Sequence, residues 1–133
     1  MNKIKVAIAG GTGYTGGELL RLLLNHPYAE VVSVLSTTSA GTRVDSIHRD
    51  LLGDTDLVCT SSLDESETPD VIFLCLGHGL SREFITSNNI PQGCKIIDLG
   101  NDFRVENTYE GKNFVYGLAE LRKDEIAKCD YLA

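Results

Sequence analysis

Long apolar runs, an excess of positive charge and closely spaced cysteines are all missing from this sequence of 133 residues. No apolar run approaches the roughly 20 residues of a membrane-spanning helix, so we expect no membrane partner. The formal net charge of −7 argues against general nucleic-acid binding, which requires a basic surface. A strand-like segment begins shortly after Met1, which leaves no room for a signal peptide, and we therefore expect a cytoplasmic protein.

The four cysteines are spread along the chain and form no C-x-x-C pair, so the sequence supports no cysteine-based metal site. Cys59 and Cys75 lie in apolar strand-like runs, where a free cysteine is usually a small core residue. Cys94 and Cys129 do not clearly follow a turn or a helix N-terminus that would lower the pKa of a thiol. We predict no metal ligand and no catalytic residue among them.

The most informative segment joins an apolar strand-like run to a leucine-rich helical run. Between them lie three glycines with the spacing Gly10-x-x-Gly13-x-x-Gly16. Such a turn lets backbone N–H groups approach a diphosphate, and the positive end of the helix dipole meets its negative charge. A purely structural turn is the alternative, but the order strand, turn, helix favours dinucleotide binding. The residues that we expect to contact the dinucleotide here are Gly10, Gly11, Thr12, Gly13, Tyr14, Thr15 and Gly16.

The end of the second expected strand, residues 30–35, indicates which dinucleotide binds. An NAD site usually carries Asp or Glu there to hold the ribose 2′-hydroxyl, whereas this strand runs into a Ser/Thr-rich segment followed by an arginine. Hydroxyl groups and a cation suit the 2′-phosphate of NADP, which a carboxylate would repel. We predict NADP as the cofactor, with a solvated Ser/Thr loop as the alternative. The residues expected at the 2′-phosphate are Ser36, Thr37, Ser39 and Arg43.

Apolar strand-like segments alternate with helical ones along the whole chain. We expect strands at residues 4–9, 30–35, 57–60, 71–76 and 95–99, with a further strand opening at 131–133. We expect helices at residues 14–25, 44–52, 80–87 and 120–128. This alternation predicts one α/β domain over residues 1–133, a Rossmann-type doubly wound fold with a mainly parallel sheet and helices on both faces.

Two more segments follow expected strands, at the edge of the sheet where ligands bind in such folds. After the strand at 71–76 come Gly77 and His78, which together with Leu76 we expect beside the nicotinamide half of the cofactor. A structural histidine is the alternative, and we assign His78 no proton transfer. After the strand at 95–99 comes Arg104, whose planar guanidinium suits a phosphate or carboxylate of the substrate. A salt bridge from Arg104 to a neighbouring aspartate is the alternative.

Four motifs together resemble the N-acetyl-gamma-glutamyl-phosphate reductase family. They are Gly-Gly-Thr-Gly-Tyr-Thr-Gly-Gly-Glu-Leu (10–19), Leu-Gly-His-Gly (76–79), Asp-Leu-Gly-Asn-Asp-Phe-Arg (98–104) and Val-Tyr-Gly-Leu-Ala-Glu-Leu (115–121). The resemblance implies an NADPH-dependent enzyme of arginine biosynthesis, a homo-oligomer with a small-molecule acyl-phosphate substrate. It also implies that the catalytic cysteine, in the family's Asn-Pro-Gly-Cys motif, would follow the segment 131–133. The chain would then be the NADP-binding portion of that enzyme, inactive by itself.

Three alternative classes of protein share part of this pattern. An aspartate-semialdehyde dehydrogenase-like reductase has a similar fold and a similar arginine, and a free-standing NADP-binding regulatory module would need no chemistry. A reductase of the short-chain or isoflavone-reductase-like type would carry a Tyr-x-x-x-Lys pair, and no tyrosine of this sequence is followed by lysine at that spacing.

Overall fold

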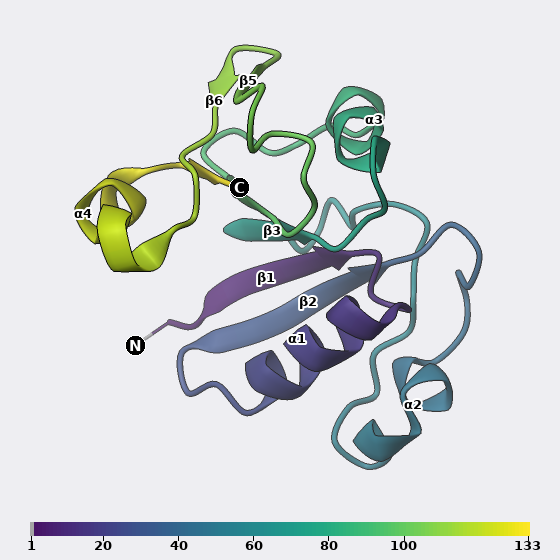
Figure 1. Ribbon diagram of the computed structural model, residues 1–133. Coiled ribbons are helices and arrows are strands. Elements are labelled where there is room, and N and C mark those ends of the chain that lie inside the picture. Colours follow the sequence, from purple (N-terminus) through teal and green to yellow (C-terminus); the bar gives the residue numbers. More distant parts are fainter. Residues whose placement is uncertain (1) are drawn as a thin grey trace.

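A five-stranded sheet with the strand order β2-β1-β3-β4-β7 forms the centre of the computed structural model, which describes residues 2–133 (Figure 1). Its strands are β1 (Ile4–Ala9), β2 (Ala29–Leu35), β3 (Val71–Leu74), β4 (Lys95–Asp98) and β7 (Tyr131–Leu132). All neighbouring strands of this sheet run parallel. The helices are α1 (Tyr14–Leu24), α2 (Val44–Ile47), the 3-10 turn η1 (Arg49–Leu51), α3 (Leu80–Ser87) and α4 (Ala119–Lys128).

Each face of the sheet has its own apolar core, because successive side chains of a strand point to opposite sides. On β1, Val6 and Ile8 belong to one core with α1 and α2, while Ala7 and Ala9 belong to the other with α3. Figure 1 shows α1 and α3 on opposite sides of the strands. Leu20, from the leucine stripe of α1, is completely buried. The expected doubly wound fold with helices on both faces is confirmed.

The chain changes direction across the sheet between β1 and β3. From β1 it crosses to β2 on one side, and after β2 it returns to β3 on the other side of β1. The carboxyl ends of β1 and β3 therefore lie side by side, and the loops that leave them diverge. In open α/β sheets this is where ligands bind. This switch point lies at the turn that begins with Gly10.

Several details differ from the sequence-based expectation. The helix expected at 44–52 is divided at His48 into α2 and η1. Residues 57–60 form no continuous strand, because Val58 pairs with Arg43 and Thr60 with Leu35, so the segment contacts two separate partners. The strand expected at 71–76 ends at Leu74. A small antiparallel hairpin was not expected, formed by β5 (Thr108–Tyr109) and β6 (Lys112–Asn113).

The outer side of β7 is covered by the segment 115–117. Val115 N–H donates to the carbonyl of Tyr131 at 2.9 Å, and Ala133 N–H donates back to the carbonyl of Val115 at 2.9 Å. Helix α4 follows this segment and has no buried residue. Within residues 2–133, no helix has the length and apolar character needed to cross a membrane.

Candidate functional site

The glycine turn after β1 is shaped by close backbone packing. Gly10 has φ +79°, a conformation that residues with a side chain rarely adopt, and a Cβ there would overlap the carbonyl of Cys75. A Cβ at Gly11 would overlap a methyl group of Val34, and one at Gly16 would lie 2.6 Å from the Gly11 Cα. These three glycines are therefore required by the fold itself, whatever the turn binds.

Gly13 differs from them. It is the N-cap of α1, with φ −84° and ψ 179°, which any residue can adopt. The only atom near a Cβ built there is the Gly10 carbonyl oxygen, at 3.9 Å, an ordinary contact distance. Packing within the protein thus leaves the glycine at position 13 unexplained. A ligand that approaches the backbone closely would explain it.

The N-terminus of α1 offers hydrogen-bond donors to such a ligand. Among residues 2–133, no oxygen atom outside the helix accepts from the N–H groups of Tyr14, Thr15 and Gly16. No acidic residue lies in the first turn, and the N-cap makes no side-chain hydrogen bond. Free N–H groups and the helix dipole together make this end of α1 suitable for an anion.

A cavity of about 180 Å³ opens beside this turn, at the carboxyl ends of β1 and β2. It brings together five of the predicted cofactor residues: Gly10, Thr12, Ser36, Thr37 and Leu76. It also includes residues that sequence reasoning missed, namely Thr38, Ser61, Phe84 and Asn88. No carboxylate lines the cavity. Hydroxyl groups and apolar side chains line it together, and the hydroxyls suit an anionic or hydroxyl-rich ligand.

The Ser/Thr segment after β2 is internally ordered. Ser36 Oγ accepts from the N–H of Ser39 at 3.1 Å and lies 3.4 Å from Thr38 Oγ1. The N–H of Ser36 donates to the carbonyl of Thr60 at 2.9 Å. The hydroxyls at the end of β2 are thus held at the rim of the cavity by the backbone around them, and Ser39 supports them without lining the cavity itself.

Arg43 does not point its charge at this cavity. Its guanidinium donates to both carboxylate oxygens of Asp45, at 3.0 and 2.7 Å, and to Asp56 at 3.1 Å. This guanidinium holds the pKa of Asp45 below its usual range. The arginine expected at the 2′-phosphate is therefore engaged by two acids, which the spacing of residues 36–43 did not reveal.

Gly77 and His78 lie away from the cavity of the glycine turn, whereas Leu76 lines it. His78 borders a different cavity, of about 350 Å³, together with Asp102 and Asn101. Its Nδ1 is 2.6 Å from Asn101 Oδ1. Asp102 accepts from the N–H of Gly79 at 2.8 Å and that of Arg82 at 3.2 Å, so it caps the start of α3.

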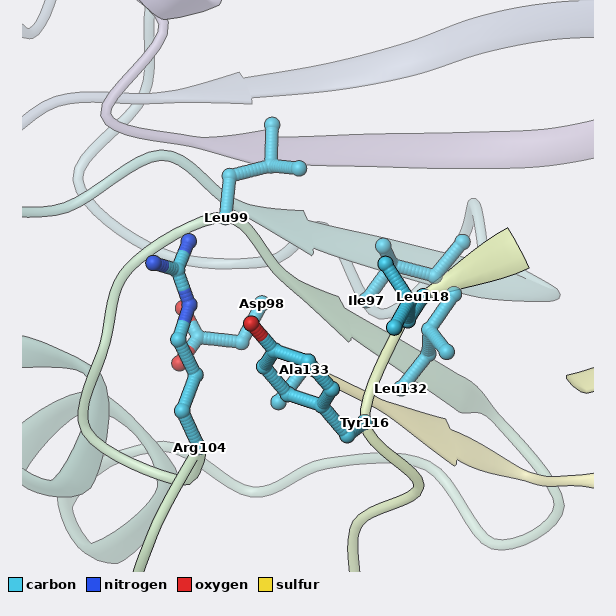
Figure 2. A pocket seen from close by; sticks show the side chains of 9 residues that line it. Ile97, Asp98, Leu99, Arg104, Tyr116, Leu118, Leu132 and Ala133 are labelled. Atoms are coloured by element: carbon cyan, nitrogen blue, oxygen red, sulfur yellow. The ribbon is translucent and has the colours of Figure 1, made fainter. Parts of the chain in front are cut away.

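Arg104 lies in a separate cavity of about 290 Å³ at the ends of β4 and β7. Figure 2 shows its side chain beside Asp98 and Tyr116. Within residues 2–133 no carboxylate forms an ion pair with Arg104, so its charge is available to an anion. Asp98 accepts from Ser81 Oγ at 2.8 Å and from the N–H of Gly100 at 3.0 Å, while its Oδ2 is buried without a partner. Burial raises the pKa of this carboxyl.

The cysteines have the character of core residues. Cys59 and Cys94 are buried, and Cys75 and Cys129 are partly buried. Burial raises the pKa of both the Cys75 and the Cys94 thiol to about 11. A thiol with such a pKa is rarely ionised at neutral pH and is a weak nucleophile. The described residues contain no cluster of His, Cys, Asp or Glu side chains arranged to hold a metal ion.

The parallel sheet, its switch point and the glycine turn at the start of α1 define a dinucleotide-binding α/β domain. A family model, the NAD-binding domain of semialdehyde dehydrogenase, matches residues 5–129. The chain belongs to this family, and its ligand is a nicotinamide dinucleotide.

Curated relatives cover nearly the whole chain. It is 48% identical over 132 residues to the N-acetyl-gamma-glutamyl-phosphate reductase of Flavobacterium johnsoniae, covering 98% of this chain and 40% of that protein. It is 44% identical over 130 residues to the reductase of the same name from Christiangramia forsetii, covering 98% of this chain and 39% of that protein. The chain thus spans well under half the length of these relatives.

Solved structures show the same fold. An aspartate semialdehyde dehydrogenase from Candida albicans, determined with NADP, superposes with a TM-score of 0.63 at 15% identity, over 98% of this chain and 42% of that one. Aspartate semialdehyde dehydrogenase II from Vibrio cholerae gives 0.66 at 22% identity, over 95% of this chain and 35% of that one.

Proposed function

We propose that residues 1–133 are the NADP-binding domain of an N-acetyl-gamma-glutamyl-phosphate reductase. The identity of 48% to a curated reductase of that name supports the assignment, and the similarity extends over 98% of the chain. The proposed dinucleotide site rests mainly on Gly13. This glycine lies at the N-terminus of α1, beside free N–H groups, at a position where packing within the protein does not require a glycine.

In the proposed site, the diphosphate of NADP lies against the N–H groups of α1 and passes Gly13 at close range. The hydroxyls of Ser36, Thr37 and Thr38 hold the 2′-phosphate, since no acid at the end of β2 would repel it. The bound dinucleotide supplies a hydride to the substrate. Because Arg43 is engaged by Asp45 and Asp56, we do not include it among the phosphate ligands.

The substrate side of the proposal rests on Arg104. Its guanidinium forms no ion pair with a carboxylate among residues 2–133, and it lies with Tyr116 at the carboxyl end of the sheet. It would hold the phosphate or carboxylate of an acyl phosphate by two parallel hydrogen bonds. His78 would lie toward this side of the sheet, beyond Leu76, without a role in proton transfer.

We propose none of the four cysteines described here as the nucleophile, because all four are buried or partly buried and burial raises the pKa of the Cys59, Cys75 and Cys94 thiols. The nucleophile would belong to a part of the enzyme outside this chain, together with the dimerisation region of a cytoplasmic homo-oligomer. We therefore propose that this chain binds NADP but does not reduce an acyl phosphate.

The test is a fluorescence titration with NADPH and NADH of the wild-type chain and of two glycine variants. We expect tighter binding of NADPH than of NADH. Gly13→Ala should weaken NADPH binding about tenfold or more, since a methyl group would separate the diphosphate from the backbone, with only a small decrease in Tm because alanine is a poorer N-cap than glycine. Gly11→Ala should lower Tm as well, because its Cβ overlaps Val34. Gly13→Ala with wild-type affinity would contradict the proposed site.

A further inference from the structure

The imidazole of His48, directly after α2, lies against the first turns of α1. Its Nε2 atom is 2.6 Å from the carbonyl oxygen of Gly11. Because a carbonyl oxygen can only accept, Nε2 carries the proton and donates it. The ring fits because residue 17 is a glycine: a Cβ there would lie 2.7 Å from the His48 Cε1. This glycine is thus explained by the histidine ring rather than by the dinucleotide.

The segment that carries His48 is anchored on α1 and in the core. Arg21, one turn after Gly17 on the same helix face, forms an ion pair with Asp50 of η1. On either side of His48, Val44 and Leu51 are buried in the core that α1 shares with the sheet. These contacts therefore fix the position of the His48 imidazole beside the glycine turn.

The hydrogen bond from His48 Nε2 to the Gly11 carbonyl determines how the Gly11–Thr12 peptide group is oriented. In a planar trans peptide, the C=O and the following N–H point in opposite directions. With the Gly11 carbonyl held toward His48, the N–H of Thr12 points away from the ring. Among residues 2–133 no oxygen accepts from this N–H, and Thr12 lines the cavity beside the turn. Glycine at position 11 makes rotation of this peptide easy unless something holds it.

We infer that His48 is a positioning residue for the dinucleotide: its Nε2–H fixes the Gly11–Thr12 peptide so that the Thr12 N–H is available to the diphosphate. The inference rests on the proposed NADP site. Without the donor at position 48 the peptide can rotate, and the ligand must then order it on binding, which weakens affinity.

The first experiment compares the wild-type chain with His48→Leu and His48→Gln. NADPH affinity is measured by fluorescence, and adenosine 2′-phosphate, which has no diphosphate, is measured by calorimetry. We expect His48→Leu to bind NADPH about tenfold more weakly, as for loss of one hydrogen bond. His48→Gln, which keeps a donor, should recover most of the affinity. All three proteins should bind adenosine 2′-phosphate equally. Wild-type NADPH affinity in His48→Leu, or an equal loss for both ligands, would overturn the role.

The second experiment uses the space beside Gly17. In the wild-type background, Gly17→Ala should displace the ring and weaken NADPH binding as much as His48→Leu does. In a His48→Ala background the same substitution should weaken binding no further, and it should raise Tm because alanine favours the helix. If Gly17→Ala weakens NADPH binding equally in the two backgrounds, it does not act by displacing the His48 ring, and the proposed link between Gly17 and His48 is wrong. A wild-type chain that binds neither ligand would overturn the proposed function, whereas wild-type binding with unaffected variants overturns only the role of His48.

Discussion

Replacing Asp102 by alanine should destabilise the domain, because this buried carboxylate caps the start of α3. The side chain is only 2% exposed and accepts from two backbone N–H groups at the start of α3. Each hydrogen bond to a charged group contributes roughly 1.5–3 kcal/mol, and loss of a helix cap costs about 0.5–2 kcal/mol. Because these figures describe overlapping effects, we expect a loss of about 3 kcal/mol. That is a large fraction of the roughly 5–15 kcal/mol typical of a domain.

The assay is urea unfolding followed by circular dichroism, where about 3 kcal/mol moves the midpoint by roughly 1–3 M. Glu106→Ala is the matched control, because Glu106 pairs with Arg82 at 3.1 Å but is 77% exposed, and such pairs contribute about 0–1 kcal/mol. Asp102→Asn, which keeps one acceptor oxygen, should fall between the two. If Asp102→Ala shifts the midpoint no more than the control does, the reasoning about the cap is refuted.

Three further outcomes are expected. The Asp98→Asn variant should gain stability relative to wild type as the pH rises from about 4 to about 8. The pKa of Asp98 is raised in the folded state, so the wild-type protein loses stability when this carboxyl ionises, whereas the variant does not. A difference in Tm between variant and wild type that stays constant with pH would contradict this. In the folded chain Cys75 should react with iodoacetamide at pH ~8 more than about a hundredfold slower than a free thiol, measured by mass spectrometry of peptides, given its pKa of about 11. Gly10→Ala should cost at least about 2 kcal/mol in a urea titration, from its positive φ and the overlap with Cys75; a neutral effect would exclude the strained turn.

The parts of the molecule that local patterns specify were predictable. The apolar run 4–9, the glycine spacing and the leucines of α1 are contiguous in the sequence, so strand, turn and helix followed from propensity and periodicity. The position of Ser36 and Leu76 beside the turn also followed, because parallel strands bring their carboxyl ends to one edge. Whether these residues contact NADP stays a prediction that the titrations address.

The remaining features depend on contacts between distant residues. Arg43 looked available beside the Ser/Thr segment, but Asp45, two residues on, accepts from its guanidinium through both carboxylate oxygens, and Asp56, 13 residues after Arg43, folds back onto it. His48 is 37 residues from Gly11, and neither residue carries a local signal of their contact. For the hairpin at 108–113 the sequence did carry a signal in Gly111, because glycine favours the positive φ that Glu110 and Gly111 both adopt in the turn, but the flanking strands are too short to show an alternating pattern.

The segment 115–117 has a consequence for self-association. Unpaired strand borders invite another molecule to add a strand, which is a common route to aggregates. On the β7 side of this domain, the N–H and C=O groups that such an addition would require are already satisfied by Val115 and Gly117. Two molecules meeting there would find no row of vacant donors and acceptors to extend. A strand from another molecule therefore cannot be added directly to β7.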